Sequence, residues 1–408
     1  MTTITSRWQR WIRGFGSSRK AEPVTSRELQ SRLEQGRRDL ADRLSQRKPR
    51  LALVKQDVCE DLYCAPSSAS PRELVESTQL RSGPVALLSP LDAAFHVLET
   101  VDAPECQLWQ ERANDLHWDT LEFFRSYQDR IPGQEYGQRR FAVYPTAIDW
   151  SQYDIVISID VAVPAAVTRR FPQTVWAYFV REIKAPSFAR SLQTPASGQD
   201  LFLNHGFRWS PPPTARHVVE FPYHLQYWGC FHDVFAVTKD EPRDGVFIDH
   251  HTLVTLTDMQ RDRLAQFGPA VGPLLPAELR LEGGKSVPPR RTMDPDLRER
   301  LLRSKYFVMT PGQRRVYGTA LVEAIAAGCL AIGSPAALES HGFVFTPATS
   351  ADTVEDAVER ITALEHSPQR FNDELQRQRD LIDWCCFMRP TLELFDKADA
   401  VRAHRMRP

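Results

Sequence analysis

The segment RSKYFVMTPGQRRVYGTALVEAIAAGCLAIGSP, residues 303–335, decides the fold expected for this chain. Its apolar run at 306–309 is typical of a strand buried on both faces, and the Pro-Gly pair at 311–312 ends that run. A helix is expected to begin at residue 318 or 319, and a second buried strand follows at 330–332. The order of strand, loop, helix and strand predicts a βαβ unit, whose loop and helix start lie at the carboxyl ends of parallel strands.

Charged side chains stand where this unit could hold a ligand. Arg314 and Arg315 come just before the expected helix start, so their guanidinium groups and the free backbone N–H groups can converge on one anion. Glu323 is a single carboxylate among apolar helix residues, on the side expected to face the ligand. The segment therefore predicts a site for a phosphorylated ligand.

The same residues resemble a known family. The pattern Pro-Gly-x-Arg-Arg, followed by Leu-x-Glu-Ala-x-x-Ala-Gly-Cys-x-x-Ile, looks like the donor-binding segment of glycosyltransferases with two facing Rossmann-like domains, the GT-B fold. It is most similar to the exostosin-like transferases. The resemblance implies that Glu323 binds the ribose of a nucleotide sugar and that Arg314 and Arg315 contact its diphosphate. Many relatives carry a second glutamate eight positions before the helix glutamate, whereas Arg315 stands there in this chain.

Further donor-binding candidates lie beside these residues or after another strand. Thr319 can offer a hydroxyl or N–H group to phosphate, or can simply cap the helix. Two histidines follow the first strand of the second domain, and one of them is expected to contact the donor. A shared metal is the weaker hypothesis, because adjacent residues on a strand point to opposite faces. The candidates are Tyr317, Gly318, Thr319, His250 and His251.

Length and composition predict a two-domain globular protein. A chain of 408 residues is too long for one core, and 42% hydrophobic with 25% charged residues is typical of a folded globular protein. The expected fold is α/β, with two facing Rossmann-like domains and an N-terminal helical appendage. The predicted divisions are a basic helical appendage at 1–48, an acceptor-binding domain at 49–240, a nucleotide-sugar-binding domain at 241–385 and a helix crossing back at 386–408.

Charge and cysteine usage bear on partners and location. A net charge of −1 argues against nucleic acid as a partner. The seven cysteines form no Cys-x-x-Cys pair, so a cytoplasmic protein without a zinc site or disulfide framework is expected. No apolar stretch has the length of a membrane span. Residues 5–16 mix tryptophan and phenylalanine with arginine at helical spacing, which predicts peripheral contact with the inner membrane face or, alternatively, a short helix packed on the protein.

Strand and helix patterns alternate along the first domain, which favours a parallel sheet. Strands are expected at 51–55, 85–88, 141–144, 154–159, 175–179 and 217–221, with a helix at 112–131 and an irregular stretch at 185–213. In the second domain the patterns predict a strand at 246–249 and helices at 257–267, 294–302, 354–364 and 371–402. Thr25 and Glu28 form a capping-box pattern that opens an N-terminal helix.

Candidates for a general base follow strands of the first domain. Carboxyl ends of parallel strands border the ligand cleft, so Asp57, Asp160 and Glu182 are the catalytic candidates, with a loop turn or helix cap as the alternative for each. The chain lacks the glycine-rich dinucleotide and P-loop motifs, the Gly-x-Ser-x-Gly elbow and the His-Glu-x-x-His metal motif.

The resulting hypothesis is a hexosyl- or related transferase. It would move a sugar from a nucleotide-diphosphate sugar to a hydroxyl of a glycan, polysaccharide or lipid-linked acceptor, with no permanently bound cofactor and no metal requirement. Two alternatives stay open: a nucleotide-sugar epimerase of the same architecture, and a non-catalytic nucleotide-sugar-binding scaffold.

Overall fold

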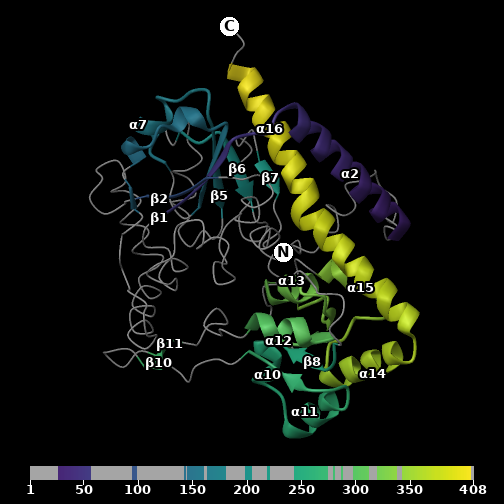
Figure 1. Cartoon of the computed structure of the whole chain (residues 1–408). Helices are drawn as coiled ribbons and strands as arrows, with labels where there is room; N and C mark the ends of the chain where they lie inside the picture. The colour runs from purple at the N-terminus through teal and green to yellow at the C-terminus, as the bar shows by residue number, and fades with distance from the viewer. Residues whose placement is uncertain are drawn as a thin grey trace, which may run out of the picture. The chain divides into compact units, whose positions relative to one another are not determined.

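The computed structural model describes residues 26–56, 94–98, 142–143, 145–159, 163–180, 198–204, 218–220, 243–273, 279–280, 286–287, 297–311, 319–337 and 342–405. The chain divides into two compact units, each built on a parallel sheet (Figure 1). The seven-stranded unit comprises Leu40–Val234, Leu275–Met293 and Pro390–Pro408. The four-stranded unit comprises Met1–Asp39, Phe235–Leu274 and Asp294–Arg389. The predicted α/β class with two parallel-sheet units is confirmed.

The sheet of the seven-stranded unit has the order β3-β2-β1-β4-β5-β6-β7, and all of its pairs are parallel. The chain runs outward from β1 to β3 and then returns to the other side of β1, where β4 begins the second half. Its strands are β1 (Leu51–Gln56), β2 (Ala94–Leu98), β3 (Ala142–Val143), β4 (Ile155–Ile159), β5 (Val175–Val180), β6 (Leu201–Asn204) and β7 (Val218–Glu220). The strand order therefore reverses between β1 and β4.

Five of these strands, β1, β3, β4, β5 and β7, lie where the sequence patterns predict them. The structure adds β2 and β6, which the patterns do not predict. The prediction of an irregular stretch at 185–213 is wrong at β6, where Leu201 and Leu203 are fully buried between β5 and β7. The residues around this short apolar run are rich in Ser, Pro, Gly and Gln, which favours an irregular stretch in the sequence, so its neighbours in the sheet determine its conformation. The strand expected at 85–88 and the helix expected at 112–131 lie outside the described residues.

Short elements complete the seven-stranded unit. Trp150, Val156 and Trp176 pack in a buried cluster on one face of the sheet. These short elements are η3 (Pro145–Ala147), η4 (Trp150–Gln152), α7 (Ala165–Thr168) and the antiparallel pair β10 (Leu279–Arg280) and β11 (Ser286–Val287).

The sheet of the four-stranded unit has the order β13-β12-β8-β9 and is also parallel throughout. Its strands are β8 (Val246–Ile248), β9 (Ala270–Val271), β12 (Tyr306–Met309) and β13 (Leu330–Gly333). Every residue of β8, β12 and β13 is buried, as expected for a sheet covered on both faces. The helices are α10 (His250–Leu253), α11 (Asp258–Ala265), α12 (Leu297–Arg303), α13 (Thr319–Ala326), α14 (Val354–Glu365) and α15 (Pro368–Ile382), with η8 (Gly342–Val344) before α14.

Two helices of this unit begin at capping boxes. In α11 the Thr257 hydroxyl accepts the Gln260 N–H, and the Gln260 side chain accepts the Thr257 N–H, so the helix expected at 257–267 begins at a capping box. In α14, the helix expected at 354–364, one apolar face is buried, with Ala357 and Ile361 fully enclosed in the core. Local sequence signals therefore determine where both helices begin and, in α14, which face is buried.

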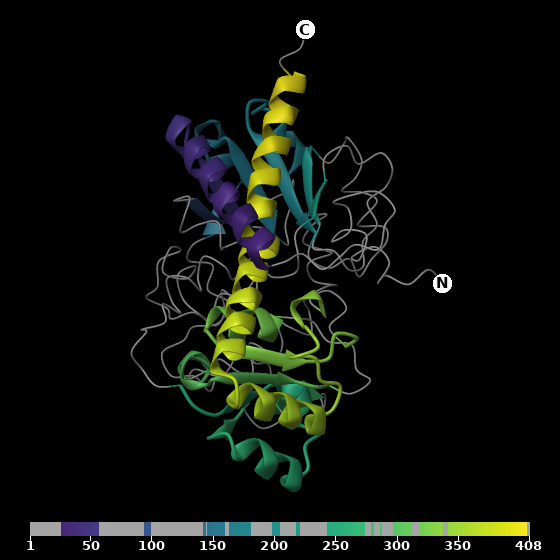
Figure 2. The same cartoon turned by 90° about the vertical axis from the view of Figure 1, so that its right-hand side faces the viewer.

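Near the N-terminus, α2 (Ser26–Gln46) packs along the C-terminal helical elements, the π-helix η9 (Asp383–Met388) and α16 (Arg389–Arg405) (Figures 1 and 2). The contact with η9 is close, because a Cβ atom at Gly36 would lie 2.6 Å from Cγ of Met388. The predicted helix is confirmed, although Thr25 lies outside the described residues. Leu29 and Leu33 are buried, so this part of α2 is packed on the protein.

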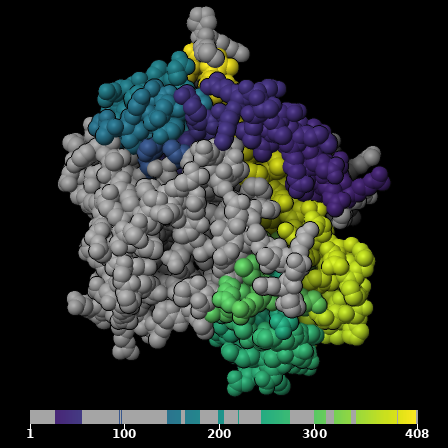
Figure 3. Space-filling model, viewed as in Figure 1, coloured from purple at the N-terminus to yellow at the C-terminus, as the bar shows by residue number. Residues whose placement is uncertain are grey.

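The opposite face of α2 belongs to the protein surface. Its exposed side chains are mostly charged or polar, including Glu34, Arg37 and Arg38, and the helix is seen in purple in Figure 3. Each helix within the described ranges is too short or too polar to span a lipid bilayer.

Candidate functional site

The candidate site of the four-stranded unit lies at the carboxyl ends of β8 and β12. These strands are parallel neighbours, with Val308 opposite Ile248. The chain leaves β8 toward β9 at one edge of the sheet and leaves β12 toward β13 at the other edge. Open α/β sheets bind their ligands where the connections diverge in this way. The switch-point site is defined here as the segment 249–252 after β8, the segment 310–311 after β12, and α13.

Glu323 lies one turn after the start of α13. The helix begins at Thr319, as the sequence predicts. Only 1% of Glu323 is exposed, and the flanking Leu321, Val322 and Ile325 are equally buried. Removing a carboxylate from water is costly unless polar groups compensate it. A buried glutamate at this position is therefore not an ordinary solvent-exposed helix residue.

The basic loop itself lies outside the described residues. It contains Arg314, Arg315, Tyr317 and Gly318, so the structure leaves these four predictions untested. Both ends of the loop are described. It leaves β12 through Thr310 and Pro311, which are buried, and enters α13 at Thr319. The loop therefore connects the carboxyl end of β12 with the amino end of the helix that carries Glu323.

The two histidines lie in α10 and not on a strand, which corrects the sequence-based expectation. Asp249 ends β8 by capping α10, because its Oδ2 atom accepts the His251 N–H at 2.9 Å. The imidazole rings of His250 and His251 lie 5.6 Å apart at an interplanar angle of 58°. The argument that the two side chains point to opposite faces of a strand is therefore wrong. Among the described residues, no group of three metal-ligating side chains comes together.

A hydrogen bond joins the segments that follow the two strands. The Thr310 N–H donates to Oγ1 of Thr252 at 2.8 Å, and Thr252 is fully buried. The backbone also connects them, since the Asp249 N–H donates to the Val308 carbonyl at 2.9 Å. Sequence reasoning missed Thr252 and Thr310. The one available signal is the spacing of Thr252, three residues after the capping aspartate.

The seven-stranded unit has its own switch point, between β1 and β4. These parallel neighbours are in register from Leu51 opposite Ile155 to Lys55 opposite Ile159. Asp57 follows the last residue of β1 and Asp160 follows the last residue of β4. Glu182 comes two residues after β5 ends. All three carboxylates lie outside the described residues, so their roles stay predictions, but the first two directly follow the strands that flank the reversal.

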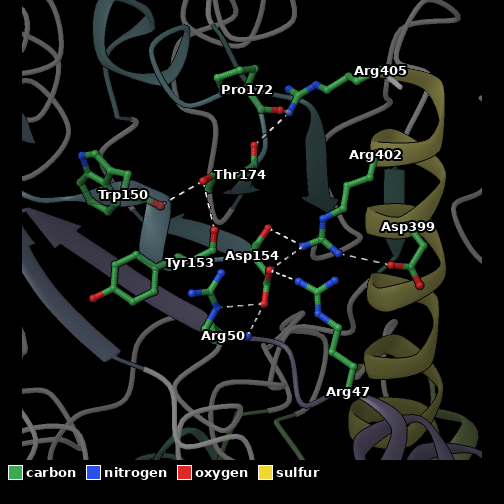
Figure 4. Close-up of polar contacts among 10 residues, drawn as sticks. All are labelled: Arg47, Arg50, Trp150, Tyr153, Asp154, Pro172, Thr174, Asp399, Arg402 and Arg405. Atoms are coloured by element: carbon green, nitrogen blue, oxygen red, sulfur yellow. Dashed lines mark hydrogen bonds and ion pairs between the residues drawn. The ribbon is translucent and has the colours of Figure 1, made fainter. Parts of the chain in front are cut away.

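A polar cluster lies at the amino ends of the strands of this sheet, away from the switch point, and its role is structural (Figure 4). Asp154, just before β4, accepts a hydrogen bond from Arg47 at 2.6 Å and from the Arg50 N–H at 2.8 Å. Arg402 of α16 donates to the Asp154 carbonyl at 2.7 Å. Arg405 contacts the Thr174 carbonyl at 2.9 Å and the carboxylate of Asp200.

This cluster holds α16 and the segment that follows α2 against the amino ends of β4, β5 and β6. Burial acts to raise the pKa of Asp154, but the hydrogen bonds from Arg50 and the charges of Arg47 and Arg402 outweigh it and lower that pKa. Ligands of parallel sheets bind at the carboxyl ends. Because the cluster lies at the amino ends, we infer that Asp154 stabilises the fold and does not bind a ligand.

Among known proteins, the chain is similar to solved structures only. No family model matches the chain, and no curated protein matches it in sequence. The chain is similar to the β-glucosyltransferase of phage T4 in complex with UDP-glucose, with 9% identity, a TM-score of 0.39, and coverage of 87% of this chain and 98% of that one. Another T4 structure of that enzyme holds UDP and Mn²⁺.

Two bacterial proteins show the same degree of similarity. HepE of Anabaena, in complex with UDP and glucose, has 10% identity and a TM-score of 0.39 and covers 86% of this chain and 100% of its own. A glycosyltransferase from Rickettsia africae has 8% identity and a TM-score of 0.39 and covers 88% of this chain and 100% of its own.

Proposed function

We propose that the protein is a glycosyltransferase that moves a sugar from a nucleotide-diphosphate sugar to an acceptor hydroxyl. One observation carries the proposal: Glu323, 1% exposed, lies on the helix that follows β12 at the switch point of a parallel sheet. The hydroxyl groups of a ribose can donate hydrogen bonds to a carboxylate. Such charge-assisted bonds are among the strongest hydrogen bonds that a neutral ligand can make. The resemblance of segment 303–335 to exostosin-like GT-B transferases supports the same role.

The diphosphate would be held by the loop before α13. Arg314 or Arg315 would bind it through a guanidinium fork, and the N–H groups at the start of α13 would add further donors. Negative charge builds on the diphosphate as the sugar departs, and fixed cations and N–H groups stabilise that charge. The proposal needs no metal for this step. Tyr317, Gly318, Thr319 and the histidines of α10 are proposed to complete the donor site.

The seven-stranded unit would bind the acceptor, a glycan or a lipid-linked sugar. Asp57 is the first candidate for the base that removes the acceptor proton, followed by Asp160 and Glu182. An enzyme that inverts the anomeric centre needs such a base, whereas a retaining enzyme does not. The proposal includes a cytoplasmic location with peripheral membrane contact through residues 5–16.

A thermal-shift screen of nucleoside diphosphates and nucleotide sugars tests the proposal. A ligand at about 100 times its dissociation constant stabilises the folded state by roughly 2.7 kcal/mol, which raises the melting temperature measurably. Failure of every nucleotide to shift the melting temperature would contradict the proposal. Incubation of the stabilising sugar nucleotide then separates the alternatives: a transferase needs an acceptor for turnover, an epimerase turns over the donor alone, and a scaffold releases no nucleoside diphosphate with any acceptor.

A further inference from the structure

The hydrogen bond between Thr252 and Thr310 crosses the switch point. Oγ1 of Thr252 accepts the Thr310 N–H at 2.8 Å, with Thr252 fully buried and Thr310 5% exposed. The two residues belong to different segments, one in the first turn after β8 and the other directly after β12. A buried N–H group must find an acceptor, and here the acceptor is a side chain of the neighbouring segment.

This bond is well placed to fix Thr310. The ladder between β8 and β12 ends with the bond from the Asp249 N–H to the Val308 carbonyl, two residues earlier. Among the described residues, Oγ1 of Thr310 is buried and finds no hydrogen-bond partner, so its own hydroxyl does not anchor the residue. Asp249 caps α10 and thereby holds the turn that carries Thr252. The chain of contacts therefore runs from the end of β8, through α10, to the residue at which the loop leaves β12.

We propose that Thr252 is a positioning residue for the diphosphate-binding loop. This inference rests on the proposed function, because the loop's arginines are there assigned to the diphosphate. Thr252 touches no ligand in this proposal. It fixes the backbone at Thr310, one residue before Pro311, and so determines where the loop starts. Small displacements of binding groups cost large factors in affinity and rate, so loss of this anchor should be felt at the phosphates more than at the nucleoside.

Two substitutions separate the hydroxyl from the shape of the side chain. Thr252→Val keeps the branched shape and removes the acceptor, whereas Thr252→Ser keeps the hydroxyl. Thr174→Val is the matched control, since Thr174 is also fully buried and its hydroxyl donates to the carbonyls of Trp150 and Tyr153 at 3.0 Å in the other unit. All variants are made in the full-length chain.

The first measurement is amide hydrogen exchange of the peptide that contains Thr310, without ligand. In Thr252→Val this peptide should exchange its amide hydrogens faster than in the wild type. In Thr252→Ser and in Thr174→Val its exchange rate should be unchanged. The second measurement is calorimetric titration with uridine and UDP, and with the other nucleosides and their diphosphates. Thr252→Val should lower diphosphate affinity by about tenfold and change nucleoside affinity by less than about twofold, with Thr252→Ser close to the wild type.

The outcomes distinguish this inference from the proposed function. Unchanged exchange at Thr310 in Thr252→Val, or an equal loss of nucleoside and diphosphate binding, overturns the positioning role while leaving the glycosyltransferase proposal in place. A wild-type protein that binds none of the nucleoside diphosphates overturns the proposed function. In that case faster exchange in Thr252→Val shows an anchor of the backbone alone, and the assignment to diphosphate binding is rejected.

Discussion

Gln378 of α15 pairs with the backbone of Ala331 in β13 through both ends of its side-chain amide. Its Nε2 atom donates to the Ala331 carbonyl at 2.8 Å, and its Oε1 atom accepts the Ala331 N–H at 2.9 Å. β13 is an edge strand of the four-stranded sheet, and Gln378 is fully buried. The side chain thus takes the place of a neighbouring strand at Ala331.

Replacement of Gln378 by leucine should destabilise the four-stranded unit by about 2–4 kcal/mol, because two buried backbone groups would lose their partners. Chemical denaturation of the full-length protein measures the change. Gln369→Leu is the control on the same helix, since the Gln369 side chain is exposed and donates to Asp373 at 2.8 Å, and it should cost less than about 0.5 kcal/mol. Equal effects of the two substitutions would contradict the role given to Gln378.

The Asp154 cluster predicts a loss of stability in acid. The folded-state pKa of Asp154 is lowered, so its contribution is fully present above the unfolded pKa of about 3.9 and is lost as pH falls through the folded value. Asp154→Asn should therefore destabilise the protein at pH 7 by about 1–3 kcal/mol, and the difference from the wild type should shrink below about pH 4.

Denaturation curves across pH 3 to 7 test this. The matched control is Asp399→Asn, because Asp399 also pairs with Arg402 but its side chain is 60% exposed. Its effect at pH 7 should stay below about 1 kcal/mol. A difference between Asp154→Asn and the wild type that persists undiminished at pH 3 would show that the carboxylate charge is not what stabilises the cluster.

The proposed ribose contact predicts that Glu323→Gln weakens nucleotide binding by roughly 1–3 kcal/mol, because a charge-assisted hydrogen bond becomes a neutral one. Calorimetric titration measures the affinity, and the melting temperature checks that the fold is intact. Glu299→Gln serves as control, since this carboxylate of the same unit is 58% exposed and pairs with Arg303. Unchanged affinity in a folded Glu323 variant would return the residue to a structural role.

The diphosphate assignment predicts that alanine at Arg314 or Arg315 removes about tenfold or more of the advantage that a nucleoside diphosphate has over its nucleoside. Lysine at the critical position should not restore it, because a point charge cannot reproduce a bidentate fork. Arg303→Ala, at an arginine whose side chain is 71% exposed before β12, controls for loss of positive charge. Retention of the full diphosphate advantage in both alanine variants would show that the assignment is wrong.

The acceptor hypothesis predicts that Asp57→Asn lowers turnover by about 100-fold or more at unchanged donor affinity, because asparagine keeps the shape and removes the base. Turnover with an acceptor and titration with the donor are measured on the same preparation. Asp160→Asn and Glu182→Gln, assayed in parallel, rank the three carboxylates. Near-normal turnover eliminates Asp57, and retention of configuration in the product removes the need for any base.

Local pattern determined much of this protein. The buried runs at β1, β4, β5, β8, β12 and β13, the start of α13 at Thr319, the capping box of α11 and the apolar stripe of α14 could all be predicted from the sequence. Each depends on residues within one turn or one strand of each other, so the signal is contained in a short window. The burial of Glu323 was predictable for the same reason, because its neighbours in α13 are apolar.

The tertiary structure alone decided the features that depend on residues far apart in the chain. β6 is a strand because β5 and β7 flank it, although the residues around it are rich in Ser, Pro and Gly. The order of the strands, with its reversal between β1 and β4, depends on which strands pair, and no local sequence pattern determines that pairing. The Thr310 N–H finds Thr252, and the Ala331 backbone finds Gln378, across 58 and 47 residues of sequence. In these last two cases a buried backbone group needed a partner, and only the assembled sheet and helices determined which side chain could reach it.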